Sequence, residues 1–130
     1  MEKYICAATP KSPFVSMDAD TGRIEIGGRS IPDNPLDFYK PLFDWIEIYS
    51  LSPKRKTQVN FRFEYFNNIS KRELTNLLHK FQLLHESVKS EVEINWFYGK
   101  DDPDMLDVGE DFKDMLKVPF NLIGVDKAIL

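Results

Sequence analysis

The sequence predicts a single α/β domain, residues 1–130, in which a mixed β-sheet carries helices mainly on one face. Strand-like and helix-like segments alternate in the order β-β(-β)-α-β-α-β-α-β, and such alternation requires parallel strands joined by crossover helices. A hairpin near the N-terminus adds antiparallel strands. Two of the later strands alternate apolar and polar residues, which indicates that only one face of the sheet is buried.

The hairpin is expected in residues 13–31, "PFVSMDADTGRIEIGGRSI". Two short apolar runs flank the turn cluster Asp18-Ala19-Asp20-Thr21-Gly22, where Gly22 is free to adopt a positive φ. The preceding run "YICAA" is a candidate for an additional edge strand.

A first helix is expected in residues 32–49, "PDNPLDFYKPLFDWIEIY". Asn34 is suited to cap it, and Pro35 suits the first helical position, where a missing N–H costs nothing. Pro41 falls inside the helix and predicts a bend. The apolar stripe is predicted to comprise Leu36, Tyr39, Leu42, Phe43, Ile46 and Tyr49.

A strand is expected in residues 57–66, "TQVNFRFEYF", with the polar residues between its apolar ones facing the other way. Its buried face is predicted to carry Val59, Phe61, Phe63 and Tyr65. An amphipathic helix follows in residues 70–88. Its apolar stripe is predicted to comprise Leu74, Leu77, Leu78, Phe81, Leu84 and Val88.

The C-terminal part repeats the pattern of strand, helix and strand. Residues 91–98, "EVEINWFY", alternate again, and the inward side chains are predicted to be Val92, Ile94, Trp96 and Tyr98. A third helix is expected in residues 101–116, with Asp102 as its cap before Pro103. The last strand is "FNLIGV". Phe61, Phe63, Tyr65, Ile94 and Trp96 are expected to be buried under the second helix.

Composition favours a cytoplasmic protein without membrane insertion. The chain is 42% apolar and 29% charged, no segment is apolar enough to span a bilayer, and Met1 begins no signal pattern. Cys6 is the only cysteine, so no internal disulfide is possible. The net charge of −4, without a basic stripe of interleaved aromatics, argues against nucleic-acid binding.

No pattern of catalytic, cofactor-binding or metal-ligating residues is found. Gly27-Gly28 lies in a hairpin strand instead of between a strand and a helix, as a phosphate-binding loop would. His79 and His85 point to different sides of one helix, and no metal-binding spacing accompanies them. One alternative to a binding module remains: a small ligand-binding or enzymatic domain that uses Trp96, Tyr98 and the acidic third helix.

The third helix is strongly acidic. Its acids are Asp101, Asp102, Asp104, Asp107, Glu110, Asp111 and Asp114. Leu106 breaks the alternation that a calcium loop needs. The acids form either a solvated helix face or a docking surface for a basic partner, in which case Asp104, Asp107 and Asp111 are the candidate contacts.

The stretch "EYFNNISKREL", residues 64–74, predicts a strand end, a polar break and a helix start. Ser70 followed by Glu73 matches the capping box, and Ile69 with Leu74 could form a hydrophobic staple. A hydroxyl at a helix N-terminus is also a good phosphoacceptor, because the free N–H groups and the helix dipole stabilise a phosphate there. Both interpretations of Ser70 remain open on the residues alone.

The longest motifs resemble the SiaC family of regulatory phosphoproteins over nearly the whole chain. The similar segments are "TGRIEIGGRSIPDNPLDFYKPLFDWI", "EYFNNISK", "NWFYGKDDPDMLDVGEDF" and "VPFNLI". The resemblance implies a STAS-like (SpoIIAA-like) fold, similar to the anti-sigma-factor antagonists, with a mixed sheet and helices on one side. This agrees with the order of elements worked out from the residues.

The resemblance also implies a non-enzymatic partner switch without a cofactor. In the family, a protein kinase of the anti-sigma-factor type phosphorylates the protein and a PP2C-like phosphatase reverses this. The unphosphorylated form activates a diguanylate cyclase, which promotes cyclic-di-GMP signalling and biofilm formation. The family acceptor is a threonine at the position of Asn68, which cannot be phosphorylated. Either Ser70 has taken this role or the chain is permanently unphosphorylated, and the implied protein-binding residues are Asn67, Asn68, Ile69, Ser70 and Lys71.

Overall fold

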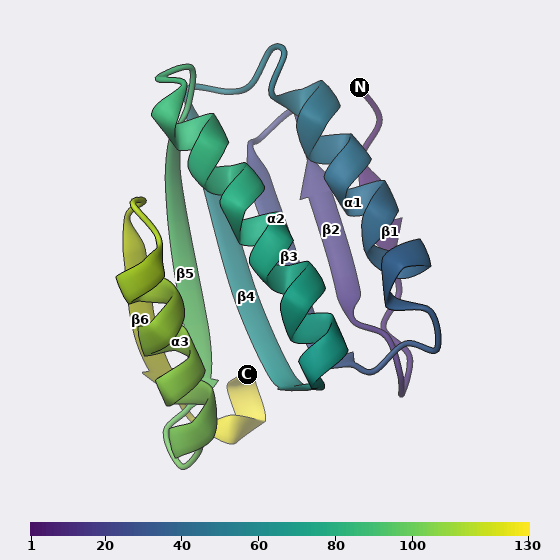
Figure 1. The fold of residues 1–130 in the computed structure, drawn as a ribbon, viewed down its shortest axis with the longest axis vertical. Helices are drawn as coiled ribbons and strands as arrows, with labels where there is room; N and C mark the ends of the chain where they lie inside the picture. Colours follow the sequence, from purple (N-terminus) through teal and green to yellow (C-terminus); the bar gives the residue numbers. More distant parts are fainter.

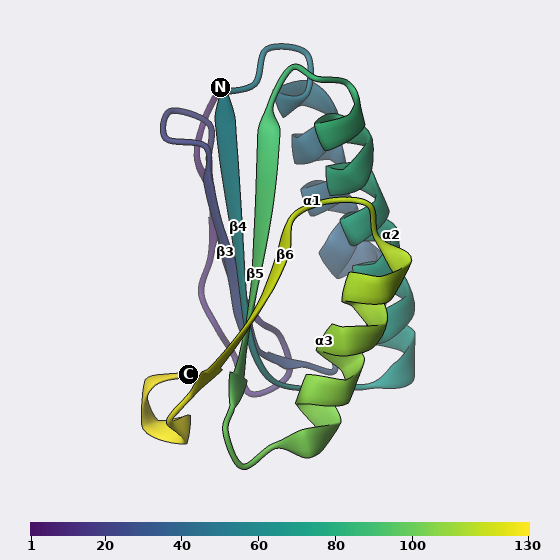
Figure 2. The ribbon, with the colours of Figure 1, turned by 90° about the vertical axis from the view of Figure 1, so that its left-hand side faces the viewer.

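A computed structural model describes residues 1–130 as one six-stranded sheet with three α-helices on one of its faces (Figures 1 and 2). The strands are β1 (Tyr4–Cys6), β2 (Phe14–Asp18), β3 (Arg23–Ser30), β4 (Lys56–Phe66), β5 (Glu91–Gly99) and β6 (Phe120–Val125). The helices are α1 (Pro35–Tyr49), α2 (Asn68–Glu86), α3 (Pro103–Met115) and the short 3₁₀ helix η1 (Lys127–Ile129). None of them is both long and apolar enough to cross a membrane.

The strands lie in the sheet in their order along the chain, from β1 to β6. The pairs β1–β2 and β2–β3 are antiparallel, and every later pair is parallel. The predicted mixed sheet, the edge strand at "YIC" and the helix layer on one face are therefore confirmed. Figure 2 shows η1 on the opposite side of the sheet, near the carboxyl ends of the parallel strands.

Two helix starts have the predicted caps. The Asn34 side chain accepts from the Asp37 N–H at 3.3 Å, and the Asp102 side chain accepts from the Met105 N–H at 3.1 Å. A proline occupies the first turn in both cases. Its missing N–H costs nothing there, because first-turn N–H groups have no acceptor within the helix. Helix α1 continues through Pro41 as one helix.

Helix α1 buries a face slightly different from the predicted one. The buried side chains are Tyr39, Leu42, Trp45, Ile46 and Tyr49. Trp45 was missed, and it stacks on Tyr49 with ring centroids 4.9 Å apart. Leu36 is 57% exposed in the first turn, and Phe43 lies at the margin of the core under the Lys80 ammonium of α2. The prediction was wrong for Leu36. This leucine fits the helical spacing of the apolar stripe, but in the first turn of α1 it is not covered by the core.

A β-bulge near the end of β4 reverses the alternation of its side chains. Gly28 pairs with Phe63 and Arg29 pairs with Tyr65, so Glu64 is an extra residue without a partner in β3. Tyr65 is consequently 47% exposed, and the prediction that it is buried was wrong. Phe66 takes the inward place instead and packs edge-on against Phe63, at 5.3 Å between ring centroids.

The main core lies between the sheet and the helices α1 and α2. Phe61, Phe63, Ile94 and Trp96 are completely or almost completely buried, as predicted. Trp96 also donates its indole N–H to the Met105 carbonyl of α3, at 3.1 Å. A Cβ at Gly109 would lie 2.5 Å from the Trp96 ring, so glycine is required for α3 to approach β5 this closely.

Helix α2 ends before the last residue of its predicted stripe. Its final residue is Glu86 and Ser87 is the C-cap. Val88 lies beyond the helix, adopts φ = 66° and is 89% exposed. The prediction that Val88 belongs to the buried stripe was therefore wrong, because the left-handed residue turns the chain away from the core.

Truncating Phe63 tests the register of β4. Phe63→Ala is expected to lower the free energy of unfolding by about 3–5 kcal/mol, because it leaves a cavity among aromatic side chains. Tyr65→Ala, two residues along the same strand but beyond the bulge, is expected to cost less than about 1 kcal/mol. Urea unfolding of both variants provides the measurement, and equal losses would contradict the bulge.

Candidate functional site

The junction between β4 and α2 is capped by Asn67. The Asn67 side-chain oxygen accepts from the Ser70 N–H at 2.9 Å, and the Asn67 carbonyl accepts from the Lys71 N–H at 2.9 Å. Ser70 is thus the third residue of the helix, and the predicted Ser70–Glu73 capping box is wrong. An asparagine caps a helix as well as a serine does, so residue type alone could not separate the two starts.

Ser70 is completely buried, and its hydroxyl belongs to a chain of three. The Ser30 hydroxyl of β3 donates to the Ser70 oxygen at 3.0 Å and lies 2.7 Å from the Tyr39 hydroxyl of α1. These contacts join β3, α1 and α2 at one end of the core. In this conformation a kinase cannot reach the Ser70 hydroxyl, which argues against Ser70 as the phosphoacceptor.

The exposed part of the junction consists of other residues. Asn68 is exposed and its side chain forms no hydrogen bond within the chain, while Ile69 is 60% exposed. The predicted staple between Ile69 and Leu74 is therefore wrong. Lys71 is half-buried. The first turn of α2 thus offers an amide, an apolar side chain and backbone N–H groups that have no partner within the helix.

The hydroxyl chain changes the acidity of Tyr39. Burial raises its pKa to about 12, the Ser30 hydrogen bond partly opposes this rise, and the negative charge of Glu73 adds to it. A phenolate at this position would lie in the core without solvent. Tyr39 therefore acts as a neutral hydrogen-bonding anchor.

A hollow of about 470 Å³ lies at the carboxyl ends of the parallel strands, near the junction. The Arg29 guanidinium lies 5.4 Å from the Tyr65 ring centroid and 3.6 Å from the Glu64 carboxylate. Asp101, Asp102 and Lys127 also line the hollow. Its wall combines acidic and basic groups and contains no serine, cysteine or histidine. No group of three metal-ligating side chains exists here or elsewhere in the chain.

The predicted acidic residues of α3 are accessible to a partner, whereas Trp96 beside them is not. Asp104, Asp107 and Asp111 are exposed on α3, and none of them forms an ion pair within the chain. Helix α3 begins at the same edge of the sheet as α2, as Figure 1 shows. Trp96 is completely buried and its indole N–H is occupied. This argues against the alternative in which Trp96 contacts a ligand.

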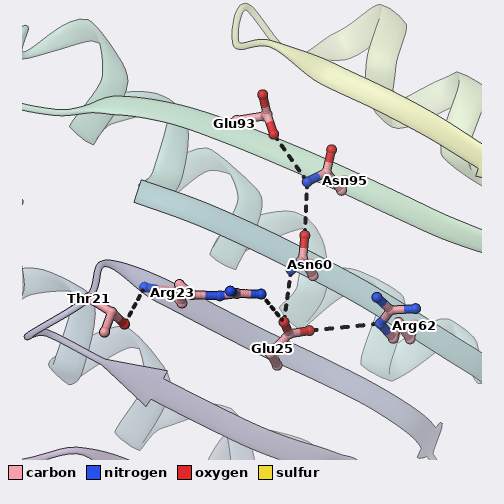
Figure 3. A network of polar contacts seen from close by, with 7 residues as sticks. All are labelled: Thr21, Arg23, Glu25, Asn60, Arg62, Glu93 and Asn95. Carbon is pink, nitrogen blue, oxygen red and sulfur yellow. Dashed lines mark hydrogen bonds and ion pairs between the residues drawn. The ribbon is translucent and has the colours of Figure 1, made fainter. Parts of the chain in front are cut away.

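The open face of the sheet carries a row of polar side chains that the sequence did not reveal (Figure 3). Asn121 donates to Asn95 at 3.0 Å, Asn95 to Asn60 at 2.9 Å, and Asn60 to Glu25 at 2.8 Å. Asn95 also donates to the Glu93 carboxylate at 3.2 Å, so the row is tied to two carboxylates, those of Glu25 and Glu93. The four residues come from four neighbouring strands, so only the strand register could have revealed the row. It satisfies polar groups that neighbouring side chains shield from water.

Solved structures share this fold over almost the whole chain. Apo-SiaC from Pseudomonas aeruginosa matches with a TM-score of 0.86 and 23% identity, over 95% of this chain and 99% of that one. SiaC from the same organism, solved in complex with the diguanylate cyclase SiaD as its activator, matches with a TM-score of 0.88 and 21% identity, over 94% and 99%. At these identities the likeness shows the fold alone: the α/β domain of these SiaC structures.

The sequence comparison identifies the family. The model of the SiaC family regulatory phosphoproteins matches residues 6–125. An uncharacterized protein of Pseudomonas aeruginosa strain UCBPP-PA14 is 23% identical over 119 residues, which are 92% of this chain and 94% of that protein. The chain belongs to the SiaC family of regulatory phosphoproteins, as its motifs predicted.

Tyr39 predicts a loss of stability at alkaline pH. Below about pH 10 the phenol is neutral in both the folded and the unfolded chain, so its contribution to stability is fully present. Between pH 10 and the folded pKa of about 12, the unfolded chain loses this proton and the folded chain keeps it. The free energy of unfolding is therefore expected to fall by about 2–3 kcal/mol across this window.

Urea unfolding at pH 9 to 12 measures this effect. Tyr39→Phe is expected to be less stable at neutral pH by about 1 kcal/mol, because it lacks the hydroxyl, and to show a smaller alkaline loss. Tyr65→Phe, which changes an exposed tyrosine, should keep the full loss. An alkaline loss of the same size in Tyr39→Phe would contradict the assignment.

Proposed function

We propose that this chain is a non-enzymatic regulator that binds a diguanylate cyclase and activates it through the β4–α2 junction. Membership of the SiaC family supports a regulatory role. The related SiaC of Pseudomonas aeruginosa is the activator in a complex with the cyclase SiaD. The observation that carries the proposal here is the exposed first turn of α2, with Asn68 and Ile69 free of contacts that the fold needs.

The buried and exposed residues of the junction have separate tasks in this proposal. Asn67 and Ser70 are occupied by the cap and the hydroxyl chain, and they hold the turn in place. Asn68, Ile69 and Lys71 form the contact surface. Binding through a preformed turn avoids the entropy cost of ordering a loop, which favours affinity.

We further infer that this chain acts as a permanently unphosphorylated member of the partner switch. The resemblance implies that the family's acceptor position corresponds to Asn68, which has no hydroxyl, and Ser70 is buried. The next hydroxyl, that of Thr75, is half-buried and donates to the Lys71 carbonyl at 2.8 Å. In this proposal the switch implied by the family resemblance, with its kinase of the anti-sigma-factor type and PP2C-like phosphatase, does not act on this chain, which keeps the cyclase-binding form.

The acidic side of α3 provides a second part of the proposed interface. Asp104, Asp107 and Asp111 are exposed and lack internal counter-ions, so their field extends into solvent. Such a field attracts a basic partner and raises the rate of association.

Position 68 tests the proposed switch. Wild type, Ser70→Ala and Asn68→Thr are incubated with the kinase of the anti-sigma-factor type from the same organism and radioactive ATP, and each is then assayed with that organism's SiaD-type cyclase. We expect label only on Asn68→Thr, and loss of cyclase activation only after that labelling. Label on wild type that disappears in Ser70→Ala would restore Ser70 as the acceptor. Failure of unlabelled wild type to activate the cyclase would contradict the proposed function.

Neutralising the acidic helix tests the second part. The triple variant Asp104→Asn, Asp107→Asn and Asp111→Asn is expected to bind the cyclase more weakly, mainly through slower association, with a flatter dependence on salt. Its thermal stability should change little, because exposed substitutions are usually within about 0.5 kcal/mol. A control triple, Glu2→Gln, Asp20→Asn and Asp33→Asn, removes the same charge from other surfaces. Surface plasmon resonance at several salt concentrations compares the two triple variants. Equal association rates would show that the acidic residues of α3 form only a solvated helix face.

A further inference from the structure

A second surface feature lies between the C-terminal ends of α1 and α2, far from the β4–α2 junction. A groove of about 360 Å³ runs between them, with Ile46 and Ser50 on the α1 side and Leu83 and Ser87 on the α2 side. The Lys80 ammonium bridges the two helices by pairing with the Glu47 carboxylate at 3.0 Å. In Figure 1 this surface lies at the upper end of both helices, whereas the β4–α2 junction lies at the lower end.

Three large apolar side chains in the groove wall and in the loops that leave it are unusually exposed. We call these residues the α1–α2 patch: Leu83 (66% exposed), which lines the groove, Leu51 (76%), next to the lining residue Ser50, and Val88 (89%), between the lining residues Ser87 and Lys89. Leu51, Leu83 and Val88 are more exposed than any other large apolar side chain of the chain. Single exposed apolar residues are ordinary, but a group beside a groove is typical of an interaction site.

Val88 is also the residue that the local backbone suits least. It occupies the position just after the helix C-cap with φ = 66°, where glycine or asparagine is strongly preferred. A β-branched side chain in this conformation is strained, and an exposed valine gains no burial in return. Neither helix termination nor the core explains a valine here. Contact with a partner would explain it.

Charge around the patch indicates the kind of partner. Lys54, Arg55 and Lys89 are exposed and form no ion pair within the chain, and the Glu91 N–H donates to the Arg55 carbonyl at 2.8 Å, which joins the two loops. Glu47, Glu86 and Glu91 are the exposed acids nearby, and Glu47 is paired with Lys80. The three unpaired cations outnumber the two unpaired acids, so the rim of the patch is basic although the chain carries a net charge of −4.

We propose that the α1–α2 patch binds an amphipathic helix with acidic flanks from a partner protein. Two neighbouring helices present a concave groove that accepts apolar side chains spaced along one face of a third helix. Acidic flanks would then meet Lys54, Arg55 and Lys89. A lipid bilayer fits less well, because the groove is concave and the net charge of the chain is repelled by anionic lipid. This surface is separate from the proposed cyclase contact at Asn68.

The test uses a synthetic peptide of about 18 residues, or five helical turns. It carries leucines at helical spacing on one face and glutamates on the flanks, and a fluorescent label reports binding to the full chain by anisotropy. We expect saturable binding that weakens about tenfold in Leu83→Ser and in Val88→Gly. The control variant Leu36→Ser, which changes a leucine of similar exposure at the other end of α1, should bind normally.

Val88→Gly separates a functional valine from a structural one. Because glycine relieves the strained φ, the thermal midpoint of this variant should rise by about 4 °C while its binding weakens about tenfold. A fall in the midpoint, or binding equal to that of wild type, would overturn the proposal. The same holds if a peptide with lysines in place of the glutamates binds equally well, or if amide chemical shifts move at Asn68 instead of around the groove.

Two further measurements test whether the patch binds a second copy of the chain or a membrane instead. Sedimentation velocity of the chain alone should show a monomer, and a dimer that Leu83→Ser dissociates would assign the patch to a second copy. Flotation with vesicles of phosphatidylcholine and phosphatidylserine should show no binding, and binding lost in Leu83→Ser would assign it to a membrane. Either result overturns the helix proposal. Leu83→Ser should activate the cyclase as well as wild type does, because Leu83 lies far from the β4–α2 junction. The peptide experiment can therefore contradict the α1–α2 patch proposal without contradicting the proposed cyclase contact at the junction.

Discussion

The position of β4 between β3 and β5 is the constraint on which the rest of the structure depends. Its in-register pairing with both neighbours places Phe61 and Phe63 under the helices and Asn60 on the open face. The extra residue Glu64 then reverses the alternation, so Phe66 completes the core and the chain arrives at Asn67 ready to cap α2. Without this bulge the cap and the exposed first turn of α2 would be rotated out of place.

Two tyrosines fix α1 against the sheet at both of its ends. Tyr39 joins the Ser30 and Ser70 hydroxyls, and Tyr49 lies 2.8 Å from the Thr57 hydroxyl, which in turn lies 2.7 Å from that of Ser90. Buried hydroxyls without partners would be costly, so each chain of hydrogen bonds permits one arrangement of helix and strand. This rigidity matters for binding, because the junction lies at one end of the helix layer and the α1–α2 patch at the other.

The sequence predicted the architecture well because periodicity reports burial directly. The alternation in β4 and β5 and the stripe of α2 identified the sheet, its open face and the main core. The site was harder, since it depends on single-residue shifts: Glu64 moves Tyr65 out of the core, Asn67 caps α2 in place of Ser70, and the turn after Ser87 exposes Val88. None of these shifts changes the apolar pattern enough to be seen in it. The amide row depends on strand register, which one sequence does not contain.

The contrast between Asn67, Asn68 and Ser70 explains how a regulatory site can change while the fold persists. Asn67 and Ser70 form hydrogen bonds that the helix start requires, so replacing either would cost stability. The Asn68 side chain forms none, and it can therefore be threonine or asparagine at almost no cost to folding. Similarity of fold consequently carries little information about phosphorylation at this position. The information lies in one exposed side chain, and the kinase assay on Asn68→Thr reads the effect of that side chain directly.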